Sequence, residues 1–251
     1  MQRGLADQRE ALRSGLDMMI LNEIRPASLL SRRYSVDPLP RTLAKFSKTF
    51  ASILETRDPS DARALLISSE ALVGQIPGRH GFQSYAHAPV LLAEMVNVIR
   101  AQYGPETDVT IWFSTRAKAP WQRSVYYQNV RTVRVTDDFE SYRNRLDAAH
   151  DLDEIVALVR AALPEQVAVR ATRLEDVKSK RLGLIEAALD PLGVPTDRLT
   201  PPDRQNAQVD GLLEALLKLN RSDLDEVTLV EEKHKVLAQY RKKRPPRPGR
   251  A

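Results

Sequence analysis

The stretch from Ile111 to Arg131, IWFSTRAKAPWQRSVYYQNVR, decides the fold of this chain. The apolar run Val109 to Phe113 has the β-branched and aromatic residues that fill a buried strand, and it stops at a polar Ser-Thr-Arg sequence ending with Arg116. A loop follows, and Pro120 is well placed as the first residue of a helix that carries Ser124. Arg116 is therefore expected at the carboxyl end of a strand.

Arg116 and Ser124 are the first candidate binding residues. In a parallel α/β sheet, ligands bind where strands end and helices begin, because helix N-termini offer unpaired N–H groups and the positive end of the helix dipole. A guanidinium fork matches the geometry of a phosphate group better than an ammonium does. The eight-residue spacing therefore predicts that Arg116 and Ser124 bind one anion.

This pattern resembles the 3′-phosphate site of sulfotransferases that use 3′-phosphoadenosine 5′-phosphosulfate (PAPS). The resemblance rests on an Arg that closes a strand, a Ser eight residues later, and the aromatic pair Tyr126-Tyr127 after that Ser. It implies a three-layer α/β fold, with a parallel sheet flanked by helices, of the P-loop nucleotide-transferase (sulfotransferase) type. It also implies that Arg116 and Ser124 hold the 3′-phosphate, that Arg204 closes over it, and that PAPS is the co-substrate.

The sequence lacks the segment that is most diagnostic of these sulfotransferases. Residues Gln2 to Arg13 predict an amphipathic helix at the start of the sequence. In the sulfotransferases, a strand and a Lys-x-Gly-Thr/Ser-Thr/Ser loop precede such a helix and bind the 5′-phosphosulfate. The N-terminal strand and this loop are missing from the sequence, as is a Walker-type Gly-x4-Gly-Lys-Ser/Thr motif. Either the start was placed too late, which we favour, or the protein is a relative that has lost the loop. We expect the chain as given to be inactive or nearly so.

Three residues are candidates for the general base, in the order Glu70, His80, His87. Sulfuryl transfer needs a base that takes the proton of the acceptor hydroxyl. A strand from Ala64 to Ile67 is expected to end in Ser68-Ser69-Glu70, which places the carboxylate at a strand's carboxyl end. The two histidines lie in the loop-like segment that follows. For each, the competing interpretation is a solvent-exposed or capping side chain.

Trp121 is expected in the loop before the helix, where its ring can stack on the adenine base, although clustered aromatic residues more often belong to a core.

The remaining pattern alternates helices and strands, which is typical of right-handed crossovers in a parallel sheet. Residues Leu224 to Tyr240 are expected to form a charged surface helix with Lys233 exposed. The other expected elements are helices over Thr42–Leu54, Pro89–Tyr103, Asp151–Leu163, Leu182–Leu189 and Val209–Leu219, a helix starting at Phe139, an extended piece over Val130–Thr136 and a strand over Val167–Thr172.

The composition of the chain excludes or disfavours several classes of protein. The chain has no cysteine and only four histidines, so no disulfide framework is possible and no metal site is expected. There is no apolar run long enough for a membrane span and no signal-peptide core, so a cytoplasmic protein is expected. The net charge is +5, but 6 of the 38 basic residues lie in the Pro-rich tail 241–251, which leaves 32 basic against 33 acidic side chains. We expect a single domain over 1–240 that does not bind nucleic acid, followed by a disordered tail.

The sequence therefore predicts a sulfotransferase-like protein that moves a sulfuryl group from PAPS to a hydroxyl or amine of a carbohydrate or small-molecule acceptor. Three other functions are open. One is a nucleic-acid binder that acts through the basic tail 241–251. Another is a non-catalytic relative that binds a nucleotide or a partner. The third is a nucleotide-sugar glycosyltransferase, for which Asp151-Leu152-Asp153 has the spacing of a metal-binding Asp-x-Asp pair, although it is expected at a helix start. The sequence does not predict an oligomeric state.

Overall fold

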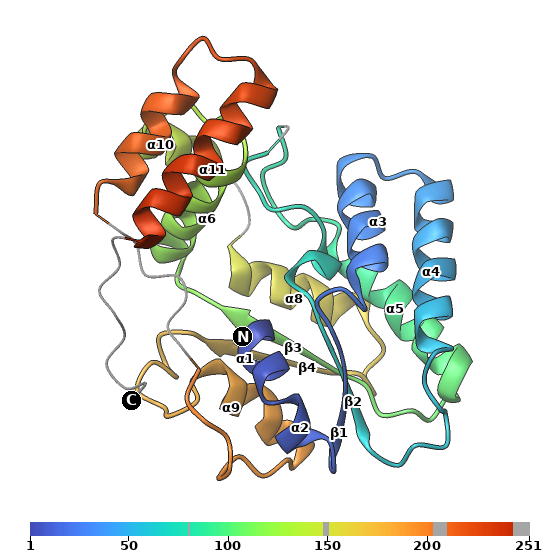
Figure 1. Ribbon diagram of the computed structural model, residues 1–251. Helices are drawn as coiled ribbons and strands as arrows, with labels where there is room; N and C mark the ends of the chain where they lie inside the picture. The colour runs from blue at the N-terminus through green and yellow to red at the C-terminus, as the bar shows by residue number, and fades with distance from the viewer. Residues whose placement is uncertain (80, 148–150, 203–209, 243–251) are drawn as a thin grey trace. The chain divides into compact units, whose positions relative to one another are not determined.

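The computed structural model describes residues 1–79, 81–147, 151–202 and 210–242 (Figure 1). Its contacts divide the chain into two compact units. Unit 1 comprises Met1–Lys118 and Ala149–Asp203, and unit 2 comprises Ala119–Ala148 and Arg204–Ala251. The single domain expected over 1–240 stays a prediction, and most of the expected tail lies outside the described residues. No helix within the described ranges is long and apolar enough to cross a membrane.

The four strands that the described residues form all lie in unit 1, and they pair in parallel. Strand β1 (Leu16–Ile20) pairs with β2 (Ala64–Ser68), and β3 (Thr110–Thr115) pairs with β4 (Ala168–Arg173). The α/β class is thus confirmed, and the strands form two small sheets in the described part of the chain. The helices of unit 1 are α1 (Gln2–Asp7), α2 (Arg9–Leu12), α3 (Arg25–Val36), α4 (Pro40–Leu54), η1 (Glu70–Val73), α5 (Ala88–Tyr103), α8 (Leu152–Ala162), α9 (Leu184–Leu189) and η2 (Asp190–Leu192).

Two hydrophobic clusters cover opposite faces of β1, because successive side chains of a strand point to opposite sides. Met19 packs into a cluster built mainly from α3, α4, α5 and α8, which we name core A. Leu16, Met18 and Ile20 pack into a second cluster with residues of α1, α2 and α9, which we name core B. Both strand pairs contribute to core A, through Met19, Leu65 and Ile67 from one sheet and Ile111, Phe113 and Val169 from the other.

The helices of core A follow directly from the sequence pattern. In α4, Thr42, Phe46, Phe50 and Leu54 are buried at intervals of four residues, which lines them along one face. Pro40 starts this helix, where its missing N–H has no intrahelical partner to lose. The helices expected over Thr42–Leu54 and Pro89–Tyr103 are confirmed as α4 and α5.

Unit 2 is helical in its described residues. Tyr126 in α6 and Tyr142 in α7 are packed with ring centroids 5.0 Å apart, and Asn129 Nδ2 donates a hydrogen bond of 2.6 Å to the Tyr142 hydroxyl. These side chains are almost completely buried, so the polar pair is satisfied inside the core. The helices are α6 (Lys118–Thr132), α7 (Phe139–Leu146), α10 (Leu212–Asn220) and α11 (Glu226–Lys242).

The C-terminal end of α6 differs from the sequence expectation. The extended piece expected over Val130–Thr136 is wrong in its first part, because α6 continues to Thr132. The ammonium group of Lys233 donates hydrogen bonds of 2.9 Å to the carbonyl oxygens of Val130 and Val133. Asn220 Nδ2 donates to Val130 O as well, at 3.2 Å. These donors satisfy carbonyl groups that a helix end leaves without intrahelical partners.

Lys233 was expected to be exposed, and this is wrong: only 3% of the residue is accessible to solvent. Lys233 lies four residues after the buried Leu229, so both side chains lie on the same face of α11. Burial lowers the pKa of Lys233 to about 8, with a smaller opposing effect from the Glu226 carboxylate and a further lowering by Arg134. The ammonium ion is therefore a titratable group inside unit 2.

We expect the stability of unit 2 to rise with pH above about 8. The folded state loses the Lys233 proton near pH 8, whereas the unfolded chain keeps it up to its ordinary pKa of 10.5, so the unfolded state binds more protons in this window. Raising the pH from 7.5 to 9.5 should add about 1–2 kcal/mol to the free energy of unfolding. Urea unfolding of a Trp112→Phe variant, followed by the fluorescence of Trp121 in α6, measures this.

Lys233→Met is the matched control, because it keeps the buried chain and removes the titrating group. Its stability should change little over the same pH range, and an unchanged pH slope in this variant would rule out Lys233 as the cause. The range stops at pH 9.5 because burial raises the pKa of Tyr126 and Tyr127, so their ionisation in the unfolded chain near pH 10 acts in the opposite direction.

Candidate functional site

Glu70 lies at the carboxyl end of β2, as the sequence predicts. It is the first residue of η1, and its side chain is exposed. Ser69 caps this short helix, since its Oγ accepts a hydrogen bond from Ala71 N–H at 3.2 Å and lies 2.8 Å from Ser28 Oγ in α3. Ser31 Oγ, also in α3, donates to Ala71 O at 2.8 Å. The backbone that carries the Glu70 carboxylate is thus fixed against α3.

The segment after η1 also lies against α3. Gly74 has a φ of +108°, and a Cβ atom at this position would lie only 2.8 Å from Cβ of Ser35. Ser35 Oγ accepts a hydrogen bond of 2.8 Å from Gln75 N–H. Glycine is needed here because the backbone adopts a left-handed conformation and approaches the helix closely.

Arg116 follows the last residue of β3 and is half-buried, which confirms its expected position at a strand end. The strand continues two residues beyond Phe113, through Ser114 and Thr115. Thr115 is 3% exposed, and its hydroxyl has no hydrogen-bond partner within the described residues. Its carbonyl oxygen accepts from Leu174 N–H at 2.9 Å, which ties this strand end to the residue after β4.

Ser124 and Trp121 both lie in α6. Ser124 is exposed in the second turn of the helix, which begins at Lys118. Trp121 was expected in the loop; it lies inside the helix and is 5% exposed, so that expectation is wrong. Its stacking on an adenine base stays a prediction that the buried ring does not favour. Arg116 belongs to unit 1 and Ser124 to unit 2, so their binding of one anion also stays a prediction.

His87 precedes α5 directly and packs between two aromatic rings. Its ring centroid lies 5.6 Å from that of Tyr34 and 6.2 Å from that of Phe82. Such packing of a ring between two aromatic side chains is a structural role. Glu70 therefore remains the stronger candidate for the base. The other two candidate residues, His80 and Arg204, lie outside the described residues.

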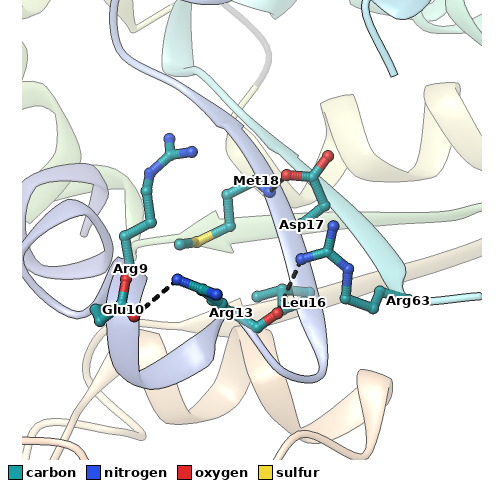
Figure 2. A pocket seen from close by; sticks show the side chains of 7 residues that line it. All are labelled: Arg9, Glu10, Arg13, Leu16, Asp17, Met18 and Arg63. Atoms are coloured by element: carbon teal, nitrogen blue, oxygen red, sulfur yellow. Dashed lines mark hydrogen bonds and ion pairs between the residues drawn. The ribbon is translucent and has the colours of Figure 1, made fainter. Parts of the chain in front are cut away.

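A small polar pocket of about 210 Å³ lies at the other end of the strands (Figure 2). Part of its wall is the amino end of β1, which contributes Leu16, Asp17 and Met18. Glu70 and Arg116, in contrast, follow the carboxyl ends of strands. Its arginines are engaged in the structure: Arg13 pairs with Glu10 at 3.1 Å, and Arg63 Nη1 donates to the Arg13 carbonyl at 2.8 Å. The lining residues are Arg9, Glu10, Arg13, Leu16, Asp17, Met18 and Arg63.

An ion-pair network next to this pocket was missed by the sequence analysis. Arg57, just after α4, contacts Asp17 Oδ2 at 2.6 Å and Glu23 Oε1 at 2.9 Å, and Arg9 contacts Glu23 Oε2 at 2.5 Å. Partial burial acts to raise the pKa of Glu23, but hydrogen bonds from Ile20 N–H, Arg9 and Arg57 outweigh it and hold this pKa below its ordinary value. The network fixes the turn between β1 and α3.

Arg57→Met is expected to lower the free energy of unfolding of unit 1 by about 1–3 kcal/mol at pH 7, because it leaves the half-buried Asp17 carboxylate and the exposed Glu23 carboxylate without their shared cation. The contribution of Glu23 is present above its unfolded pKa of 4.5 and is lost as the pH falls through the lower folded pKa. Urea unfolding at pH 7 and pH 3.5 should thus show a smaller difference between variant and parent at the lower pH. Arg57→Lys, which keeps the charge, should be less damaging at pH 7. A difference that is equal at both pH values would contradict the role of Glu23.

Comparisons of the chain with protein-family models, with curated proteins and with solved structures gave no match. Of the predicted site residues, Glu70 and Arg116 lie at strand ends of unit 1 and Ser124 lies in unit 2, so their forming one site stays a prediction. Within the described part of the chain, no group of three or more His, Asp or Glu side chains is arranged to hold a metal ion.

Proposed function

We propose that this chain is a sulfotransferase-like protein of the α/β P-loop nucleotide-transferase type, with a site for the 3′-phosphate of PAPS. The observation that carries the proposal is that Arg116 directly follows β3 and Glu70 lies two residues after the end of β2, each strand being a member of a parallel pair. Carboxyl ends of parallel strands are where α/β proteins bind ligands. The acceptor would be a hydroxyl or amine of a carbohydrate or small metabolite.

The residues have chemically distinct roles in this proposal. Arg116, a half-buried cation, supplies a guanidinium fork to the 3′-phosphate, and the exposed Ser124 hydroxyl supplies a further hydrogen bond. Glu70 accepts the proton of the acceptor group as a general base, a role that its exposed carboxylate permits. PAPS, when bound, supplies the sulfuryl group and a phosphate leaving group.

The residues fit only one half of PAPS. The printed sequence has no Lys-x-Gly-Thr/Ser-Thr/Ser loop, so it lacks the lysine and backbone donors that would stabilise charge on the leaving phosphate oxygen. The chain as given should therefore bind the nucleotide without turning it over at a substantial rate. Sulfuryl transfer from PAPS measured with this chain would contradict the second part of that statement.

Arg116→Ala is expected to weaken the binding of 3′-phosphoadenosine 5′-phosphate, the desulfated product, by more than tenfold, or about 1.4 kcal/mol. The reason is the loss of a charge-assisted, bidentate contact with the 3′-phosphate. Calorimetric titration of the parent chain and the variant measures the effect. Arg170→Ala, which removes an exposed arginine from β4, is the matched control and should leave the affinity unchanged. Equal affinities of the parent and Arg116→Ala, or no binding by either, would count against the proposal.

The titration does not separate the main proposal from a non-catalytic relative, because both would bind the nucleotide. An assay of sulfuryl transfer after the missing loop is added upstream separates them, since the relative would stay inactive. The glycosyltransferase alternative has less support. Asp151 is the N-cap of α8 and forms a capping box with Glu154, while Asp153 forms an ion pair with Arg173. Both carboxylates of the Asp-x-Asp pair thus have structural partners.

A further inference from the structure

Helices α3 and α4 are strongly basic in a chain whose other residues are close to neutral or acidic. The segment 25–54 contains 6 of the 38 basic residues but only 1 of the 33 acidic residues, Asp37. The tail 241–251 holds another 6 basic residues, which leaves 26 basic against 32 acidic side chains in the rest of 1–240. The positive charge of 1–240 is therefore concentrated on one pair of helices. Its six cations are Arg25, Arg32, Arg33, Arg41, Lys45 and Lys48.

These cations have no acidic partners within the described part of the chain. None of the six side chains forms an ion pair or a hydrogen bond there, and all except the half-buried Arg32 are exposed. Like charges without counter-charges repel one another and destabilise the folded state, so such a surface is typical of proteins that bind an anionic partner. Arginines elsewhere in the protein do form ion pairs, as in Arg9, Arg57, Arg63, Arg134, Arg145 and Arg173.

The cations of α4 point away from core A. Arg41, Lys45 and Lys48 follow one another at intervals of four and three residues, so they lie along one side of the helix. The buried Phe46 and Phe50 lie on the opposite side. Helix α4 packs beside α3, and the short connection between them makes the two helices antiparallel neighbours (Figure 1).

The outer side of α3 combines cations with exposed aliphatic side chains. Leu29 and Val36 are 53% and 49% exposed. Arg25, Leu29 and Arg33 follow at intervals of four residues, and Val36 comes three residues after Arg33, so all four lie on the same side. The phosphate groups of a nucleic acid would leave both aliphatic side chains in water. At a bilayer surface, cations contact anionic headgroups while aliphatic side chains enter the boundary of the acyl chains.

We propose that the outer sides of α3 and α4, which carry the five exposed cations together with Leu29 and Val36, bind a membrane surface that contains anionic phospholipids. The 12 and 15 residues of these helices give lengths of about 18 and 22 Å, so that several headgroups can be contacted at once. The binding is peripheral and needs no segment that spans the membrane. The proposal rests on the charge and exposure of the two helices and does not depend on the proposed function.

Cosedimentation of the full chain with lipid vesicles tests this proposal. Vesicles of phosphatidylcholine with about 30% phosphatidylserine supply the anionic surface, and vesicles of phosphatidylcholine alone are the comparison. The chain should bind the first and not the second. Raising the salt concentration from about 0.1 M to about 1 M, which shortens the Debye length from about 10 Å to about 3 Å, should weaken the binding at least tenfold.

A charge variant assigns the binding to the two helices. Arg41→Gln combined with Lys45→Gln should weaken binding to the anionic vesicles about twentyfold, since each cation close to such a surface contributes about fivefold. Arg170→Gln combined with Lys178→Gln is the matched control, because it removes one exposed arginine and one exposed lysine from segments outside these helices. Its affinity should stay within about twofold of the parent.

A second variant tests the aliphatic contribution. Leu29→Ser should weaken the binding about fivefold, because it removes an apolar side chain that enters the membrane boundary. Leu158→Ser is the matched control, since Leu158 of α8 is also an exposed leucine, with 42% of its surface accessible. This control should bind as the parent does. All of these substitutions are at exposed positions, and unchanged circular dichroism confirms that each variant is folded.

Three results would overturn the proposal. The first is that the parent chain does not bind the anionic vesicles. The second is that the two charge variants bind equally well, which would mean that the net charge or the basic tail 241–251, present in every variant, causes the binding. The third is that Leu29→Ser binds as well as the parent, which would favour a nucleic acid or another polyanion as the partner. None of these measurements involves a nucleotide, so a failure here is distinct from a failure of the sulfotransferase proposal.

Discussion

Phe46→Ala is expected to lower the free energy of unfolding of unit 1 by about 3–5 kcal/mol, the range for an aromatic side chain removed from a core. Phe46 has no exposed surface, and its ring stacks on that of Phe50 with centroids 6.1 Å apart and planes at 5°. The substitution removes this contact and leaves a cavity in core A, where α4 packs on α3 and α5.

The measurement is urea unfolding of a Trp121→Phe variant, in which the fluorescence of Trp112 reports on β3 alone. Trp112 is a suitable reporter because its indole N–H donates to Thr172 Oγ1 across the β3–β4 pair at 3.0 Å, a contact that unfolding breaks. Phe46→Leu keeps most of the buried volume and should cost clearly less. A loss below about 1 kcal/mol for Phe46→Ala would mean that core A is not packed as described.

Gly74→Ala is expected to cost about 2–4 kcal/mol, which combines the strain of an unfavourable backbone conformation with a steric contact. The new methyl group would lie 2.8 Å from Ser35 Cβ, a side-chain atom that is bonded directly to the backbone of α3 and cannot rotate away. The segment after η1 would have to move away from α3. Unfolding experiments with the Trp112 reporter measure the loss of stability.

Gly104→Ala separates the two causes. Gly104 ends α5 with a φ of +105°, close to that of Gly74, but a Cβ atom there would meet nothing within 4 Å. Its substitution should show the conformational strain alone, about 1–2 kcal/mol. If Gly74→Ala and Gly104→Ala cost the same, the close approach of the η1 segment to α3 contributes nothing to stability.

Elements whose core face is set by local periodicity could be predicted from the sequence. The apolar spacing within Thr42–Leu54 and Pro89–Tyr103 is helical whatever lies around it, and both helices begin within two residues of their expected starts. Strand β1 was harder to predict from the sequence, because a short apolar run fits a buried helix or a buried strand equally well. In the structure this segment is a strand because it pairs with β2, where Leu16 is the partner of Ala64, 48 positions further along the chain.

The errors in unit 2 have a common physical cause. The sequence around Val130 does not show that Lys233 and Asn220, 103 and 90 positions later, donate to its carbonyl oxygen. These donors stabilise the last turn of α6, where an extended piece was expected. The burial of Lys233 could have been found from its four-residue spacing to Leu229, because a long lysine on the apolar face of a helix must either reach the surface or find acceptors.

The strand-end positions of Glu70 and Arg116 were predictable because a polar residue directly after a buried apolar run marks the edge of a sheet. The start of the helix that carries Trp121 was not predicted correctly, since α6 begins at Lys118, two residues before Pro120. Proline is tolerated within the first turn of a helix, so Pro120 does not fix the start. The Arg57 network joins residues of separate elements, and no spacing along the sequence indicates that they meet.

The interleaving of the two units sets the order in which the chain can fold during its synthesis. Unit 1 needs α9 to complete core B around α1, and unit 2 needs Lys233 and Asn220 to complete the end of α6. At roughly 5–20 residues per second, the ribosome requires roughly 5–20 seconds to pass from Val130 to Lys233. Throughout this interval the last carbonyl groups of α6 lack these donors, so unit 2 is completed last, when the C-terminal helix leaves the ribosome.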